Sequence, residues 1–88
     1  TLPLRARLAK QLLHLVRSYG VASLADGHEV RIGLQLAQEE LAQLLGASRQ
    51  RVNQELKSME REGAIRIEPG GLVVRDRQAL MQIIESDN

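Results

Sequence analysis

The segment from Ala37 to Gly63 constrains the fold more than any other part of the chain. Its apolar residues recur every three or four positions, which predicts two amphipathic helices, over residues 38–45 and 48–62. Only a very short turn separates them, so the two helices must cross soon after the first one ends. This arrangement predicts a helix-turn-helix motif. The side chains expected to face inward from the first helix are Leu41, Leu44 and Leu45.

The turn between the two helices has the residues that such a connection needs. Gly46 can adopt a left-handed backbone and end the first helix, and Ala47 follows it. Ser48 is a good N-cap for the second helix, because its hydroxyl can accept a hydrogen bond from a main-chain N–H of the first turn. Gly63 is expected to end that helix.

The flanking segments predict further elements. A helix is expected from Leu4 to Tyr19 and to end at Gly20, followed by a loop over Val21–Gly27 and a half-buried strand over Glu29–Leu36. The expected apolar residues of the first helix are Leu4, Leu8, Leu12, Leu15, Val16 and Tyr19.

After the motif, the chain predicts a hairpin and a closing helix. Short apolar runs surround Pro69 and Gly70, a pair that suits the centre of a type II turn, so residues 65–75 are expected to form a wing. Asp76 can cap a short helix in which Leu80, Ile83 and Ile84 face inward. The fold class is therefore α+β, a winged helix-turn-helix with a small antiparallel sheet, and residues 1–88 are expected to form one domain.

Composition excludes several other classes of protein. The 88 residues contain no Cys, Phe or Trp, and Tyr19 is the only aromatic residue. Disulfide frameworks, thiolate metal sites and aromatic platforms for unpaired bases are therefore excluded. No apolar run approaches the length that spans a membrane, and the start does not resemble a signal peptide.

The second helix of the motif has two different sides. Val52, Leu56 and Met59 form a narrow apolar stripe, and the opposite side is polar. Amides of Gln and Asn can pair with adenine and Arg with guanine, so the polar side predicts contact with the major groove of double-stranded DNA. The two glycines of the wing could offer main-chain N–H groups to a phosphate. The candidate DNA-binding residues are Ser48, Arg49, Gln50, Arg51, Asn53, Gln54, Lys57, Gly70 and Gly71.

Alternative interpretations of these residues are less well supported. A solvated helix face is also rich in Arg, Lys and Gln, and a winged helix that only contacts another protein would explain the net charge of +1. The basic residues of Thr1–Arg17 could likewise form a solvated helix face. His14 and His28 lack metal-ligand spacing, and the carboxylates of Glu39 and Glu40 have no visible acid–base partner. We expect no enzyme activity, cofactor or metal.

The chain resembles the C-terminal DNA-binding domain of the Crp/Fnr family of bacterial transcription regulators over about residues 5–84. The matching motifs are Glu39-Glu40-Leu41, Leu45-Gly46, Ser48-Arg49, Met59-Glu60-Arg61-Glu62-Gly63 and Ile65. The resemblance implies a cytoplasmic regulator that is a homodimer in its full-length form and contacts RNA polymerase, with no membrane association. The sensor domain and dimerisation helix of the family are not in this sequence, so we expect this part alone to be monomeric.

The resemblance also implies roles for single residues. Arg49 matches the family's base-reading Arg, and Ser48 matches a position that contacts phosphate. Gln50 stands where many members have Glu, and Gln54 where many have Arg, so the half-site is expected to differ from the family's common one. Ala37 stands where a capping Thr or Ser is frequent.

Overall fold

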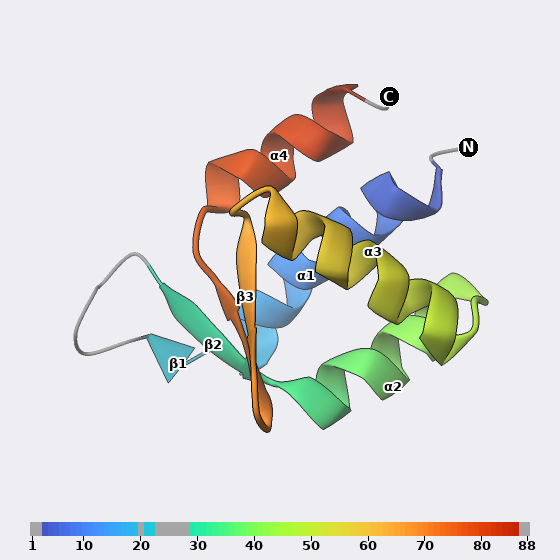
Figure 1. Ribbon diagram of the computed structural model, residues 1–88, viewed down its shortest axis with the longest axis horizontal. Helices are drawn as coiled ribbons and strands as arrows, with labels where there is room; N and C mark the ends of the chain where they lie inside the picture. The colour runs from blue at the N-terminus through green and yellow to red at the C-terminus, as the bar shows by residue number, and fades with distance from the viewer. Residues whose placement is uncertain (1–2, 20, 23–28, 87–88) are drawn as a thin grey trace.

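The computed structural model describes residues 3–19, 21–22 and 29–86, which form four helices and four strands. Figure 1 shows α3 crossing in front of α1, with the sheet to one side and α4 above. This is the α+β winged helix-turn-helix fold that the sequence predicts. The elements are α1 (Leu4–Tyr19), β1 (Val21–Ala22), β2 (Val30–Gly33), α2 (Leu34–Leu45), α3 (Arg49–Arg61), β3 (Ile65–Glu68), β4 (Gly71–Val74) and α4 (Arg77–Ser86).

The strand before the motif pairs with the hairpin after it. The sheet is antiparallel throughout, in the order β1-β2-β4-β3, so β2 lies beside β4, and β3 is an edge strand. The predicted loop over Val21–Gly27 is wrong at its first two residues, which form β1 and pair with β2. A strand of two residues is too short to show an alternating pattern. The predicted helix end at Gly20, like the remainder of that loop, lies outside the described residues.

The boundary between β2 and α2 also differs from the prediction. The strand expected to reach Leu36 ends at Gly33, and α2 begins at Leu34 rather than near residue 38. Alternating leucines at positions 34 and 36 fit a short strand or the first turn of an amphipathic helix equally well. Gly33 is the N-cap and makes no side-chain capping hydrogen bond. Ala37 therefore lies inside α2 and is not its N-cap. The N-cap that lacks a capping side chain is Gly33.

The hydrophobic core lies between α1, the two motif helices, the sheet and α4. Leu8, Leu12, Leu41 and Leu56 are fully buried. Leu44 was expected to face inward, but 55% of it is exposed. Neighbouring helical residues are about 100° apart, so a helix that buries residue 45 turns residue 44 toward its edge. The other buried residues of the same hydrophobic cluster are Ala9, Leu15, Val16, Val30, Ile32, Leu45, Val52, Met59, Ala64, Ile65, Leu72, Val74, Leu80 and Ile83.

The turn of the motif has the predicted geometry. Gly46 adopts the left-handed conformation, with φ 64° and ψ 30°, and its N–H donates to the carbonyl of Ala42. A residue with a Cβ atom rarely adopts this φ, so glycine permits the abrupt end of α2. Ser48 then caps α3, because its Oγ accepts a hydrogen bond from the N–H of Arg51 at 3.1 Å. Together these residues set the angle at which α3 leaves α2.

The hairpin is joined to α3 by a side chain as well as by the backbone. Glu60 Oε2 accepts a hydrogen bond of 2.8 Å from the N–H of Ile67 on β3. At the tip, Gly70 has φ 72°, as a type II turn requires of the residue after Pro69. Asp76 caps α4 by accepting from the N–H groups of Gln78 and Ala79, at 3.0 and 3.2 Å, as predicted. Glu60 therefore joins strand β3 of the wing to α3, and Asp76 caps the helix that follows the wing.

Candidate nucleic-acid interface

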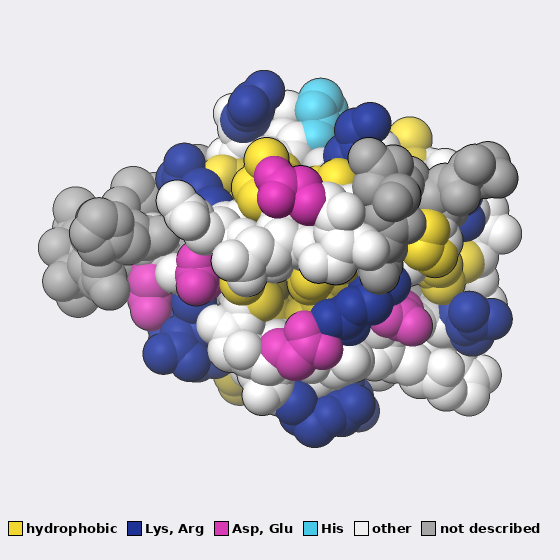
Figure 2. Space-filling view, turned by 90° about the horizontal axis from the view of Figure 1, so that it is seen from above, with side chains coloured by type: hydrophobic (Ala, Val, Ile, Leu, Met, Phe, Trp, Pro, Cys, Tyr) yellow, Lys and Arg dark blue, Asp and Glu magenta, His cyan; other side chains and the backbone are white. Residues whose placement is uncertain are grey.

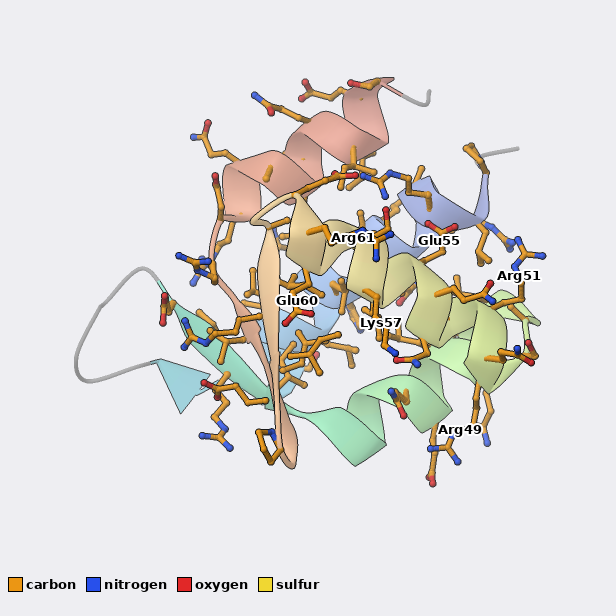
Figure 3. The ribbon with its side chains drawn as sticks, in the orientation of Figure 1. Arg49, Arg51, Glu55, Lys57, Glu60 and Arg61 are labelled. Carbon is orange, nitrogen blue, oxygen red and sulfur yellow. The ribbon has the colours of Figure 1, made fainter. Side chains whose placement is uncertain are left out.

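The candidate interface is the outer side of α3. Val52, Leu56 and Met59 are fully buried, so the opposite side of the helix must face solvent. In Figure 3, Lys57 lies on the side of α3 turned toward the viewer, and Arg49 lies at its first turn. The structure thus presents most of the predicted α3 residues together on one surface. Ser48, Arg49, Gln50, Arg51, Gln54 and Lys57 are not buried, and Asn53 is half-buried.

The N-terminal turn of α3 adds a partial positive charge to this surface. The first N–H groups of any α-helix lack helical partners, and here the first turn contains no acidic residue. The Ser48 hydroxyl occupies one of these donors, that of Arg51. A helix N-terminus of this kind, with Arg49 in its first turn, is an arrangement that attracts a phosphate.

Gln38 belongs to this surface, although it is not among the residues predicted from the sequence. Its Oε1 accepts a hydrogen bond from Nη2 of Arg49 at 3.3 Å, and its Nε2 donates to Oδ1 of Asn53 at 3.5 Å. Gln38 lies on α2, and its partners are 11 and 15 residues away in sequence. Helical periodicity places residues on a face of their own helix, so it gives no signal for a contact between two helices.

The acidic residues of α3 and of its C-cap, Glu62, are engaged away from the polar side. Glu55 lies 3.8 Å from Nη1 of Arg5, and Glu62 forms a shorter ion pair with the same guanidinium. Glu60 accepts from the main chain of Ile67. In Figure 3, Glu60 lies at the end of α3 that faces the hairpin. The polar side of α3 is consequently left to basic and uncharged residues.

Two of the basic residues in the N-terminal segment have structural roles. Arg5 also donates to Oγ of Ser58 at 3.2 Å, so it joins α1 to α3. Arg7 donates to the carbonyl of Leu45, the last residue of α2, at 3.4 Å. A cation is favourable at that end of a helix. Lys10 is exposed and remains a solvated residue of α1.

The surface seen from above Figure 1 carries charges of both signs. Figure 2 shows Lys and Arg side chains interspersed with Asp and Glu, and hydrophobic atoms are visible between them. Mixed charge of this kind is typical of an ordinary solvated surface. It differs from the polar side of α3, where the three carboxylates are engaged elsewhere.

The two glycines of the wing differ in how far a ligand could approach them. Gly70 is exposed at the tip. Gly71 is buried, and the register places it opposite Gly33 on one side and Glu68 on the other. The guanidinium of Arg31 lies against it, so that a Cβ at position 71 would meet Nε at 2.8 Å. The phosphate contact expected of both glycines is therefore geometrically open at Gly70 and obstructed at Gly71.

Basic residues beside the wing are already paired with carboxylates. Arg66 donates to Glu68 at 3.0 Å and to Glu29 at 3.3 Å, and these hydrogen bonds, that of Glu68 first, raise the pKa of Arg66. Nε of Arg75 lies 3.7 Å from Oε2 of Glu29, and Nη1 of Arg31 lies 3.7 Å from Oε1 of Glu68. The charge of the wing is largely balanced within the protein, so its attraction for a phosphate depends on the main chain at the tip.

Comparison with known proteins assigns this architecture. Residues 6–83 match the model of the Crp-like helix-turn-helix domain. The chain belongs to this family. The match includes both motif helices and the whole wing, which confirms the resemblance seen in the sequence.

The relatives are transcription regulators. Over 74 residues the chain is 40% identical to a CRP-like cAMP-activated global transcriptional regulator of Mycobacterium tuberculosis, covering 84% of this chain and 32% of that protein. A CRP/FNR family transcriptional regulator from Thermus thermophilus superposes with a TM-score of 0.84 at 28% identity, covering 100% of this chain and 43% of that one. The CO-dependent transcription factor CooA from Carboxydothermus hydrogenoformans gives a TM-score of 0.72 at 28% identity, covering 91% of this chain and 36% of that one.

These matches confirm the predicted function, DNA binding by a Crp/Fnr-type transcription regulator, and give no support to the protein-contact alternative. The chain spans about a third of the length of the curated relative. The relatives are named as regulators rather than enzymes. None of the helices in the described part of the chain combines the length and apolar character needed to span a membrane.

Proposed function

We propose that the chain binds double-stranded DNA sequence-specifically by placing the N-terminal half of α3 in the major groove. The observation that carries this proposal is the polar side of α3, which is exposed opposite three fully buried residues. Ser48 sets the start of the helix, and Arg49 follows it directly. Arg49 would read a guanine, because a guanidinium can donate two parallel hydrogen bonds to O6 and N7 of that base.

The remaining residues of α3 would divide into base-reading and backbone-binding groups. Gln50 and Gln54 have amides that match the major-groove edge of adenine, whereas Lys57 has a flexible point charge better suited to a phosphate. Their neutral amides replace charged residues common in the family, so the preferred half-site would differ from the family's common one. Arg51 and Asn53 flank this set.

Salt-dependent titration of selected duplexes tests the proposal. Replacing Gln50 with Glu is expected to change which sequences are preferred. Replacing Lys57 with Ala is expected to weaken binding to all sequences similarly and to reduce the slope of log affinity against log salt by up to about 1, the value for one phosphate contact. Exposed Lys10 on α1 supplies the matched control, because K10A removes the same charge from a different helix.

Three outcomes of this titration are informative. Uniform weakening by Q50E together with sequence-dependent weakening by K57A would reverse the proposed division of roles. An equal effect of K10A and K57A would show that net charge, rather than the side of α3, determines binding. Failure of the unmodified chain to bind any duplex at low salt would favour the protein-contact alternative.

The wing supplies a further testable contact. We expect the amide signal of Gly70 to shift when duplex DNA is added, because this residue is exposed at the tip and has no side chain. The Gly71 amide is expected to move less, since that residue is buried between two strands. The measurement is an NMR titration in which the signals of α3 report binding. If the α3 signals move while that of Gly70 stays fixed, the wing only covers the core.

The partners of the longer regulator also belong to this proposal. We propose a cytoplasmic homodimer whose two copies of α3 enter successive major grooves about 34–36 Å apart, one turn of DNA. RNA polymerase would be a second partner. Support comes from the family and from the length of the relatives, of which this chain covers 32% in one case and 43% in another.

A further inference from the structure

We infer that Gln38 is a positioning residue for DNA recognition, which holds Arg49 and Asn53 in the orientation that reads the base. This inference rests on the proposed function of α3. The inference is based on a contact between α2 and α3 at the candidate interface. Gln38 accepts from Nη2 of Arg49 at 3.3 Å and donates to Oδ1 of Asn53 at 3.5 Å.

The chemistry of the amide explains why a Gln suits this position. An amide has an acceptor oxygen and a donor NH₂ group at its two ends. Gln38 uses the oxygen for a cation and the nitrogen for a carbonyl-type oxygen, so the two partners together fix which way its amide lies. Arg49 and Asn53 are separated by one helical turn, on the same side of α3. One side chain from α2 can therefore reach both.

The contact leaves the reading groups available. A guanidinium has five N–H donors, and Arg49 uses only one of them on Gln38. The donors that would pair with a guanine are still free to do so. Asn53 engages its oxygen with Gln38, which turns its NH₂ group in the other direction. Gln38 would thus act through its neighbours without contacting a base itself.

The length of these hydrogen bonds indicates what Gln38 contributes. At 3.3 and 3.5 Å between surface side chains, they are long and add little to the stability of the free protein. Their effect on binding is different, because an exposed Arg loses rotamer freedom when it docks on a base. Restricting Arg49 before binding reduces that entropic cost. The contribution of Gln38 should therefore appear in affinity and base preference rather than in thermal stability.

A double-mutant cycle on a selected half-site duplex tests this role. Q38M keeps the length of the side chain and removes both hydrogen bonds. We expect it to lower affinity by about two- to tenfold, the range of one net hydrogen bond, and to relax preference at the base pair assigned to Arg49. In the R49A background the same substitution should cost less, because Arg49, one of the two residues that Gln38 positions, is absent. Circular dichroism should show unchanged folding.

Two further variants sharpen the test. Q38E keeps an acceptor for Arg49, so it should retain the base preference that Q38M loses, while its charge near DNA weakens binding to all sequences. Q43M makes the same replacement at an exposed Gln of α2 and should change neither affinity nor preference.

The outcomes separate this inference from the function it rests on. Equal losses from Q38M in the native and R49A backgrounds would overturn the positioning role and indicate an independent contact, such as one to a phosphate. The positioning role would also be overturned if the unmodified chain binds specifically and Q38M keeps both its affinity and its base preference. If the unmodified chain prefers no duplex at all, the proposed function fails first and the inference fails with it.

Discussion

Replacing Arg49 with Ala is expected to reduce affinity for the best duplex by about 1–3 kcal/mol, the range for one good two-pronged contact to a base. Arg49 lies at the first turn of α3, where Ser48 caps the helix and no acidic side chain is present. The variant should also lose its preference at one base pair, because the discrimination comes from the two hydrogen bonds to guanine. Selection from a random duplex pool, followed by titration of the best sequence, measures both effects.

Arg17 provides the control for this prediction. It is exposed in the last turn of α1, and R17A removes one positive charge from a helix outside the candidate interface. We expect R17A to keep the base preference of the unmodified chain. An R49A protein whose preferences match the unmodified chain at every position would show that Arg49 does not read a base.

Joining two copies of this chain is expected to raise affinity for a duplex with two half-sites by about 10²–10⁴, with no new contact to DNA. A single copy keeps only its own base and phosphate contacts. Its first helix, α1, is engaged within the domain, because Leu8, Leu12 and Leu15 are fully buried. We therefore expect the separate chain to be monomeric and to bind one half-site weakly. Sedimentation of the free chain and titration of half-site and full-site duplexes measure these properties.

The spacing of the half-sites supplies the control. Recognition helices of related dimers lie about 34–36 Å apart, and moving one half-site by half a turn of DNA places it on the opposite side of the duplex. The gain in affinity from joining two copies should then disappear, unless the linker is long enough to reach around the duplex. A separate chain that sediments as a stable dimer, and needs both half-sites for measurable binding, would show that a dimer interface lies within these residues.

Local patterns predicted much of the fold, because the determining contacts occur within single elements. The apolar stripe of Val52, Leu56 and Met59, the cap at Ser48 and the left-handed Gly46 each depend on nearby residues, and the structure confirms all of them. The boundary at Gly33 was placed wrongly, since leucine alternation over a few residues fits either a strand or a helix. The short strand β1 forms only because β2 is beside it.

Contacts between distant segments decided the parts that the sequence could not predict. Arg66 and Arg75 are basic residues of the wing, but they pair with Glu29, and Arg66 also pairs with Glu68. Gln38 of α2 belongs to the candidate interface because it contacts Arg49 and Asn53 on α3. Composition and periodicity show which residues are polar. They do not show which polar side chains form ion pairs or hydrogen bonds with one another. The roles of the α3 residues on DNA remain predictions.

The hydrogen bond between Glu60 and Ile67 also affects how copies of this protein meet at high concentration. β3 is an edge strand, and unpaired N–H groups along such an edge are a template on which a strand of another molecule can add. Glu60 accepts from the Ile67 N–H, so this position is occupied by the protein's own side chain. The carboxylate that joins α3 to the wing therefore also opposes the addition of another strand at this position of β3, as a charged group at a strand edge does in many β-sheet proteins.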